Sequence, residues 1–159
     1  MTVATVSRDG TGIPWATPVY TAFDGDCDFF WLSDRHSAHS VNIRNNPDVG
    51  LVTFDSTVPE GTGAGGGVYI QARARELSAP DEARRAEECL TARAGRPVRP
   101  LAGRSGQSPA RFYVARPTRM WVNDSLLRDG VRVDGRTEVD LDALRETERA
   151  ASARLRGHG

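Results

Sequence analysis

The chain has 159 residues, which is enough for one compact domain with a hydrophobic core. Its 21 basic and 21 acidic residues give a formal net charge of zero, so the total charge does not favour binding to nucleic acid or to an anionic membrane. The sequence has no apolar run of the roughly 20 residues that span a membrane and no signal-peptide pattern at its start, so we expect a soluble cytoplasmic protein.

The sequence contains no lysine, and all 21 residues counted as Lys or Arg are arginine. A pyridoxal phosphate Schiff base and a Walker phosphate loop both require a lysine amine, so both are excluded. Any phosphate must be bound by arginine, histidine, hydroxyl groups or backbone amides. Cys27 and Cys89 lie outside any CxxC pattern and favour neither a disulfide framework nor a thiolate metal site.

Short β-strands separated by turn residues are predicted for the first two thirds of the chain. Asp9-Gly10 and Asp24-Gly25 are typical of hairpin turns, so the strands beside them are expected to be consecutive and antiparallel. Pro117 is expected to separate the last two extended segments. The predicted strands cover residues 2–6, 17–23, 27–32, 49–54 and 68–77, and the last pair of extended segments covers residues 112–115 and 119–122.

Two helices are predicted among these strands. The first lies within Ser33–Asn46, where Pro47 ends it, and the second covers Pro80–Ala94, behind a sequence that resembles a capping box at residues 78–81. Residues 95–110 hold too many glycines and prolines for a regular element and predict a loop. Five or six strands with two inserted helices favour a closed or partly open β-barrel.

The composition changes after Asn123, which divides the chain into a domain of residues 1–122 and a C-terminal extension of residues 123–159. Val131 and Val133 lie near Asp-Gly pairs and are expected in a small hairpin or arm. A thin apolar stripe at helical spacing is formed by Leu141, Leu144, Ala151 and Leu155. Such a stripe is typical of a helix that docks on another surface.

Residues 61–66 match the G-x-G-x-x-G pattern of dinucleotide-binding folds. That interpretation requires a helix next, whereas a strand is predicted from Val68, so a flexible loop near a pocket is favoured. His36 and His39 are three residues apart, a spacing that suits a metal, but no third ligand is visible nearby. Surface or phosphate-contacting histidines are the stronger interpretation.

The most polar cluster of the sequence, Ser33–Ser40, directly follows an apolar strand. Its hydroxyl groups, Arg35 and two histidines come together with the amides of a helix start, a set of groups that binds phosphate in the absence of lysine. An ordinary capped helix start is an equally good interpretation.

Two aromatic residues, Tyr113 and Trp121, flank Arg116 and Arg119 in the last strands. Aromatic rings with guanidinium groups line planar ligands, but they equally close the core of a barrel, and the sequence leaves both open. No Ser-His-Asp arrangement or carboxylate pair stands out, so no catalytic residue is identified.

Residues 29–39, followed by Asn45-Asn46-Pro47, resemble the segment of the FMN-binding split-barrel family, related to pyridoxamine 5′-phosphate oxidases, in which an aromatic strand leads to a Ser-Arg-Lys phosphate clamp. In this register Ser37 matches the family serine, Ala38 replaces an arginine and His39 stands where a lysine is usual. Arg35 and Arg44 are candidates to replace the positive charge that Ala38 and His39 do not supply. Residues 111–121 resemble the family's closing strand with its aromatic pair and Arg-Pro-Ser-Arg core.

The resemblance spans most of residues 1–122 and implies a mainly β fold, a six-stranded split barrel with inserted helices. It also implies FMN as cofactor at the interface of a homodimer, with Tyr113 and Arg119 approaching the flavin or substrate from the second subunit and residues 17–20 running along the flavin ring. The implied cofactor-binding residues are Thr17, Pro18, Val19, Tyr20, Leu32, Ser33, Arg35, His36, Ser37, His39, Tyr113, Arg119 and Trp121.

The implied function is an FMN-dependent oxidoreductase that acts on a small organic substrate by hydride transfer at flavin N5. Alternatives are a reductase of the same fold that uses the deazaflavin F420, a non-catalytic flavin-binding protein, and a heme-binding relative with His36 or His39 as axial ligand. Turnover of pyridoxamine 5′-phosphate is not expected, because the clamp departs at Ala38 and His39 and the chain continues past Trp121. Substrate selection is expected in loops 61–67 and 95–110.

Overall fold

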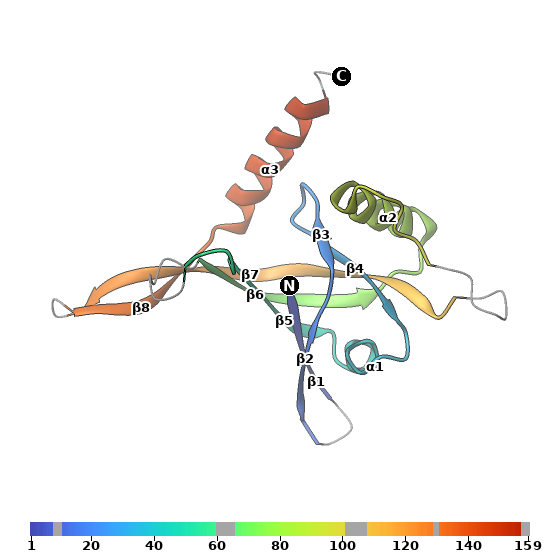
Figure 1. The fold of residues 1–159 in the computed structure, drawn as a ribbon, viewed down its shortest axis with the longest axis horizontal. Coiled ribbons are helices and arrows are strands. Elements are labelled where there is room, and N and C mark those ends of the chain that lie inside the picture. Colours follow the sequence, from blue (N-terminus) through green and yellow to red (C-terminus); the bar gives the residue numbers. More distant parts are fainter. Residues whose placement is uncertain (8–10, 60–65, 101–107, 129–130, 157–159) are drawn as a thin grey trace.

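The computed structural model describes residues 1–7, 11–59, 66–100, 108–128 and 131–156 (Figure 1). The strands are β1 (Thr2–Val6), β2 (Pro14–Pro18), β3 (Thr21–Phe23), β4 (Phe29–Asp34), β5 (Asp48–Phe54), β6 (Gly67–Glu76), β7 (Ala110–Arg128) and β8 (Val131–Glu138). The helices are α1 (Ala38–Asn45), α2 (Pro80–Ala94) and α3 (Leu141–Arg156). All paired strands are antiparallel, in the order β2-β1-β5-β6-β7-β4-β3, and β8 pairs with β7.

The sheet curls because two strands that are consecutive in the chain lie at its opposite ends. Only Val19 and Tyr20 separate β2 from β3, so these residues cross the gap between the first and last strands of the order. The predicted single strand 17–23 is therefore divided, because β2 pairs with β1 whereas β3 pairs with β4 at the other end of the order. The expected split barrel is confirmed, with eight strands in the described sheet rather than six.

β7 runs through Pro117, where the sequence predicted a break between two strands. Gln71 pairs with Arg119 while Ala72 pairs with Pro117, so Thr118 is the extra residue of a β-bulge. A bulge accommodates a proline because one position of the ladder needs no N–H there. The predicted separation into two strands was wrong.

The helix predictions are confirmed in place but differ at their starts. α2 has the predicted bounds, whereas its N-cap is Ala79 and no side chain caps it, so the predicted capping box is not formed. Pro80 at the first helical position begins the helix instead. α1 begins only at Ala38, because Ser33 and Asp34 extend β4 by pairing with the start of β7.

The core has two apolar layers, one on each face of β4. The barrel cluster contains Trp31, Leu51 and Ile70 and receives Ile43 from α1. The second cluster lies between the sheet and α2 and contains Phe30 and Leu90. Side chains alternate between the faces of a strand, so a strand buried on both faces is apolar at successive positions, as β4 is.

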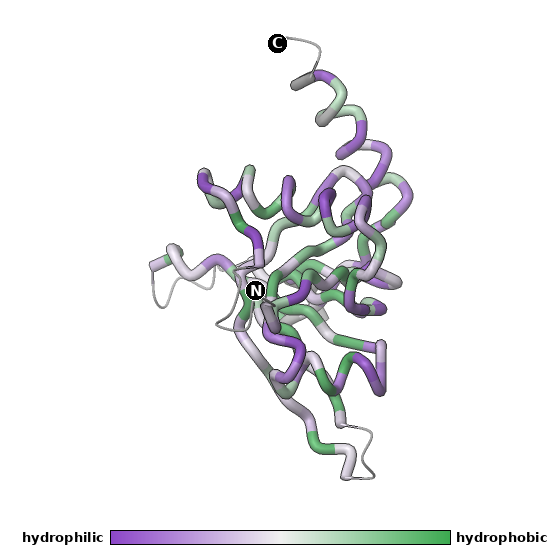
Figure 2. Tube along the Cα trace, turned by 90° about the vertical axis from the view of Figure 1, so that its right-hand side faces the viewer, coloured by the Kyte–Doolittle hydropathy of each residue, from purple (hydrophilic) through white to green (hydrophobic). Residues whose placement is uncertain are grey.

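The C-terminal extension continues the barrel's last strand. β7 passes residue 123 without interruption and pairs with β8, so the predicted hairpin arm is confirmed (Figure 1). Leu141 and Leu144 of the predicted apolar stripe pack against the barrel cluster, whereas Ala151 of the same stripe is exposed and α3 extends away from the body. Figure 2 shows hydrophilic residues along much of α3, near the C-terminus. None of the helices in the described ranges has the length and apolar character needed to cross a membrane.

Candidate functional site

The turn from β4 into α1 holds a serine–histidine network made of Ser33, Ser37, His39 and Ser40. His39 Nε2 lies 2.9 Å from Ser33 Oγ, and its Nδ1 lies 3.3 Å from Ser37 Oγ. Ser37 Oγ is also 2.9 Å from Ser40 Oγ. His39 is only 5% exposed, and burial lowers the pKa of its imidazole below the usual range. His39 is therefore a neutral hydrogen-bonding group. It stands where the family that residues 29–39 resemble usually has a lysine.

The two histidines of this turn have different environments. Both ring nitrogens of His39 lie within hydrogen-bond distance of serine hydroxyls, so binding a metal or heme iron would require breaking one of these contacts. His36 is exposed, and its backbone N–H donates to Asp34 Oδ1 at 2.7 Å. Positive charge reaches the turn from Arg44, whose Nη2 donates to the carbonyl of Arg35 at 2.8 Å.

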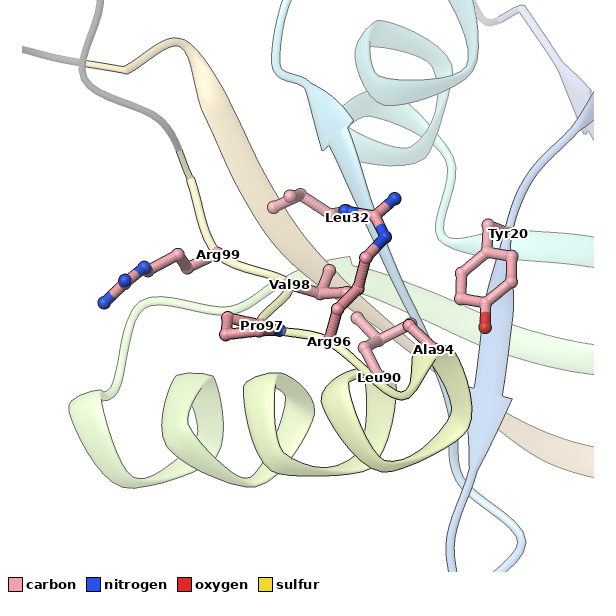
Figure 3. Close-up of a pocket in the computed structure, with 8 residues that line it drawn as sticks. All are labelled: Tyr20, Leu32, Leu90, Ala94, Arg96, Pro97, Val98 and Arg99. Atoms are coloured by element: carbon pink, nitrogen blue, oxygen red, sulfur yellow. The ribbon is translucent and has the colours of Figure 1, made fainter.

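A pocket of about 630 Å³ lies on the opposite face of β4, between this strand and α2 (Figure 3). We call it the α2 pocket. Its lining residues are Tyr20, Leu32, Leu90, Ala94, Arg96, Pro97, Val98 and Arg99. Figure 3 shows the side chain of Arg96 extending between Leu32 and Tyr20, whereas Arg99 extends away from them. The volume lies in the range of ligand pockets, roughly 300–1,000 Å³.

The α2 pocket carries uncompensated positive charge. The guanidinium of Arg93 lies 5.8 Å from the ring centre of Tyr20, which is 53% exposed. Across the described ranges, no carboxylate forms an ion pair with Arg93, Arg96 or Arg99. Residues 95–110 contain no Asp or Glu, so this segment supplies no carboxylate of its own. The pocket therefore favours a flat molecule with an anionic group.

The residues predicted around β4 fall into two neighbouring groups. Leu32 faces α2 and the α2 pocket, whereas Ser33 faces His39 and α1. Adjacent residues of a strand point to opposite faces, so the two groups meet only at the C-terminal end of β4. There Arg35, whose amide bonds to the carbonyl of Pro109, begins the turn between them.

The four predicted residues at positions 17–20 span the end of β2 and the connection to β3 that closes the barrel. Thr17 and Pro18 belong to β2, and Pro18 is exposed. Val19 donates its N–H to the carbonyl of Met1 at 2.9 Å and packs against the barrel cluster. Of these four residues, only Tyr20 lines the α2 pocket.

Of the predicted residues of β7, Tyr113 reaches the serine–histidine network, where its side chain hydrogen-bonds to Ser40. Tyr113 is 1% exposed and stacks on Trp31 with ring centres 5.6 Å apart, while its hydroxyl donates to Glu76 at 3.4 Å. Burial raises the pKa of Tyr113. In this chain Tyr113 closes the core, which was one of the two interpretations left open. Its predicted approach to a cofactor remains a prediction.

Arg119 and Trp121 form a separate pair, in which Arg119 is exposed and Trp121 is half-buried. The guanidinium of Arg119 lies 4.6 Å from the ring centre of Trp121 and donates two hydrogen bonds of 2.8 Å to Glu138 of β8. The C-terminal extension therefore neutralises Arg119. Its role toward a cofactor also remains a prediction.

The sequence patterns did not predict the contribution of α2 to the site. Leu90 and Ala94 form one wall of the α2 pocket, and Arg96 and Arg99 follow directly. The available signal was the run of arginines 93, 96 and 99 in a stretch without acidic residues. The loops expected to select substrate are described in part. Residues 61–65 and 101–107 lie outside the described residues, as does most of the G-x-G-x-x-G match, whereas residues 96–99 of the loop 95–110 line the α2 pocket.

Solved structures share this fold at low sequence identity. A heme-binding protein from Mycobacterium smegmatis aligns with a TM-score of 0.61 and 18% identity over 91% of this chain, which spans 54% of that protein's length. An F420 reductase aligns with a TM-score of 0.53 and 21% identity over 75% of this chain and 86% of its own. The heme storage protein of Vibrio cholerae aligns with a TM-score of 0.55 and 19% identity over 76% of this chain and 83% of its own.

Sequence comparison agrees with the fold. No curated protein is significantly similar to this chain. The family model described as pyridoxamine 5′-phosphate oxidase matches residues 1–124, which include the β4–α1 turn and Tyr113–Trp121. The chain therefore belongs to the pyridoxamine 5′-phosphate oxidase family.

Proposed function

We propose that this protein is a flavin-dependent oxidoreductase that uses FMN, with F420 as the alternative cofactor. The observation that carries the proposal is the α2 pocket, which combines Tyr20 and Leu32 with the uncompensated Arg96 at the strand end that also bears the serine–histidine network. An apolar wall suits a flat ring system, and arginine suits a phosphate. The residues present therefore fit a flavin nucleotide. When bound, the flavin supplies hydride chemistry.

The chain's residues would bind and orient the cofactor. Tyr20 and Leu32 offer the surface for the ring. The turn of Arg35 and Ser37 offers hydroxyl and cationic groups for the phosphate, and no side chain caps the amides of α1 in the described structure. Neutral His39 holds the turn through Ser33 and contributes no charge, so the positive charge must come from arginine.

The proposed substrate is a small organic molecule with an anionic group. Arg96 points between Tyr20 and Leu32, where such a group would be held beside the ring system. None of the described residues that line the α2 pocket is acidic, and we assign no acid or base catalyst to it. Binding, orientation and exclusion of water are then the protein's contributions to the reaction.

We further propose a homodimer with the cofactor at its interface. Tyr20, Phe23 and Trp15 are each about half exposed, at 53%, 49% and 50%. Large exposed aromatic side chains of this kind are typical of surfaces that bind a partner. A second copy over Tyr20 would exclude water from the α2 pocket.

Heme binding is the second candidate function, because two of the solved structures that share the fold are heme proteins. In this chain the exposed His36 is the better candidate for an axial ligand, since both nitrogens of His39 contact serines. An absorption spectrum separates heme from flavin directly. A flavin-binding protein without turnover remains the third candidate.

Titration of the purified protein with FMN, riboflavin and F420, followed by absorption and calorimetry, tests the proposal. We expect FMN or F420 to bind, and Leu32→Trp to weaken that binding about tenfold or more by filling the α2 pocket. Val41→Trp is the matched control, since Val41 lies on α1 and is 38% exposed. Failure of both cofactors to bind would overturn the proposal.

A further inference from the structure

A second pocket, of about 280 Å³, lies at the end of the barrel where α3 begins. We call it the barrel-end pocket. Its apolar wall includes Phe29, Ile70 and Met120 of the barrel cluster, and α3 contributes Leu144 and Glu148. The family model ends at residue 124, so α3 is a feature of this chain outside the matched region.

α3 is held in place by specific polar contacts to the body. Arg149 donates from Nε to Asp26 Oδ1 at 2.7 Å, and this hydrogen bond lowers the pKa of Asp26. Arg145 donates to the carbonyl of Asp26 and to the carbonyl of Pro117, both at 3.3 Å. Together with the packing of Leu144, these contacts fix α3 as a wall of the pocket.

The turn that receives α3 is itself ordered by hydrogen bonds. Asp24 Oδ1 accepts the amide N–H groups of Asp26 at 3.0 Å and of Asp28 at 3.3 Å. Arg85 of α2 reaches Asp26 Oδ2 at 3.0 Å. Asp26 therefore joins α2 to α3, and the position of α3 over the barrel end is defined from both sides.

Charged groups of both signs line the barrel-end pocket. They are Glu148 and Arg93, whose guanidinium also lies 5.8 Å from the ring centre of Tyr20. Met1 lines it as well, and its terminal ammonium donates to the carbonyl of Val19 at 3.5 Å. The thiol of Cys27 also lines the pocket, is 3% exposed and has a pKa raised by burial, so it is neutral. Most of the lining is apolar, and a charge buried against apolar walls without a partner is costly, so the pocket suits an uncharged ligand best.

The volume sets the size of the occupant. An apolar cavity of roughly 150 Å³ in another protein holds benzene, so a pocket about twice as large accommodates a ring with substituents. It lies across β3 from the α2 pocket, since Tyr20 lines one pocket while Thr21 and Phe23 line the other. The two pockets therefore differ in position, in size and in charge.

We propose that the barrel-end pocket is a second binding site, completed by α3, for a small uncharged molecule of ring size. This site is separate from the α2 pocket and does not depend on the proposed flavin chemistry. Its ligand class is opposite to that of the α2 pocket, which carries arginines without carboxylate partners in the described structure.

Fluorine NMR with two small probes tests this site in the full chain. Fluorobenzene is uncharged and suits the barrel-end pocket, whereas 4-fluorobenzoate carries the anionic group that the α2 pocket favours. We expect saturable broadening of the fluorobenzene signal, and a loss of about tenfold or more in its affinity for Val68→Phe, which fills the pocket. Thr53→Phe fills the barrel-end pocket from β5. It replaces Val68→Phe in the test if circular dichroism shows that Val68→Phe does not fold.

Two further variants separate the pocket from general effects. Arg149→Gln removes an anchor of α3 and is expected to weaken fluorobenzene binding about threefold. Val41→Phe, on α1, is expected to leave it unchanged. Equal binding by the wild type and both filled variants would overturn the proposal. Binding that appears only on dilution to a monomer would also overturn it, because a second copy would then fill the pocket.

Discussion

Two groups of arginines lie on and around α2, and they have opposite surroundings. Arg85, Arg116 and Arg149 face the turn of Asp24, Asp26 and Asp28 and are paired with its carboxylates. Arg96 and Arg99 line the α2 pocket, and Arg93 lies 5.8 Å from the ring centre of Tyr20; none of the three forms an ion pair within the described ranges. The same side chain therefore stabilises the fold in one group and is free to bind a ligand in the other.

The two groups of arginines differ in their ion pairs because of the neighbouring strands rather than because of α2. Asp28 is 5% exposed, and burial raises its pKa, so its charged form depends on Arg85 at 3.3 Å and Arg116 at 3.2 Å. A buried carboxylate left without its partner is destabilising. An exposed arginine beside an apolar pocket does not need such a partner. Its removal therefore changes ligand binding more than it changes the free energy of unfolding.

The largest expected effect is on the paired group. Arg85→Gln leaves three carboxylates in one turn with fewer cations, and it also removes the guanidinium that lies 5.3 Å from the ring centre of Phe30. We expect the free energy of unfolding to fall by about 2 kcal/mol, measured by urea denaturation. Arg84→Gln is the control, since Arg84 lies on the same helix and is 68% exposed. Equal stability of the two variants would contradict the structural role.

The unpaired group is tested by binding. Arg96→Gln removes the cation that points between Tyr20 and Leu32, so we expect about tenfold weaker binding of 4-fluorobenzoate. The free energy of unfolding should change by less than about 0.5 kcal/mol. Arg99→Gln, from the same segment but pointing away, should have a smaller effect. If Arg96→Gln weakens the binding of FMN but not the binding of riboflavin, Arg96 holds the phosphate of the cofactor rather than the anionic group of a substrate.

His39 differs from both arginine groups because burial keeps it neutral. Its pKa lies below the usual value of 6.5, so its contribution to stability is present above that value and is lost as the pH falls through the folded-state pKa. We expect the wild type to lose more stability than His39→Gln between about pH 7.5 and pH 5. Parallel stability curves for the two proteins would show that His39 is not buried in neutral form.

The smallest effect is expected at the exposed edge of the paired group. Arg149 and Asp26 have side-chain exposures of 61% and 46%, so water and salt screen their ion pair. Arg149→Gln should lower the free energy of unfolding by much less than Arg85→Gln does, and added salt should reduce the difference. A loss comparable to that of Arg85→Gln would show that α3 is needed for the stability of the whole barrel.

Local sequence signals predicted the parts of the site that lie close together in the chain. Ser33, Ser37 and His39 follow an apolar strand within seven residues, and the structure joins them in one network. The same signals predicted the bounds of α2 and the end of α1 before Pro47. These features depend on the alternation of side chains, on proline and on turn residues, all of which act over a few positions.

Tertiary packing decided the rest. Residues 17–23 were predicted as one strand, but β2 and β3 pair with different partners at opposite ends of the sheet. The sequence left open whether Tyr113 lines a ligand or closes the core, and pairing of β7 with β4 stacks it on Trp31 inside the barrel. The α2 pocket needs Leu90 and Arg96 against Leu32, a contact between segments about sixty residues apart that no local pattern encodes.

The sequence by itself determined the class of fold, the absence of lysine and therefore the reliance on arginine for any anion, and the polar turn after β4. Only the tertiary structure decided which arginines are neutralised by carboxylates, which face of β4 carries the α2 pocket, and that His39 is buried. The physical reason is that charge compensation and burial depend on distances between residues remote in the chain, whereas turns and strand patterns depend on neighbours.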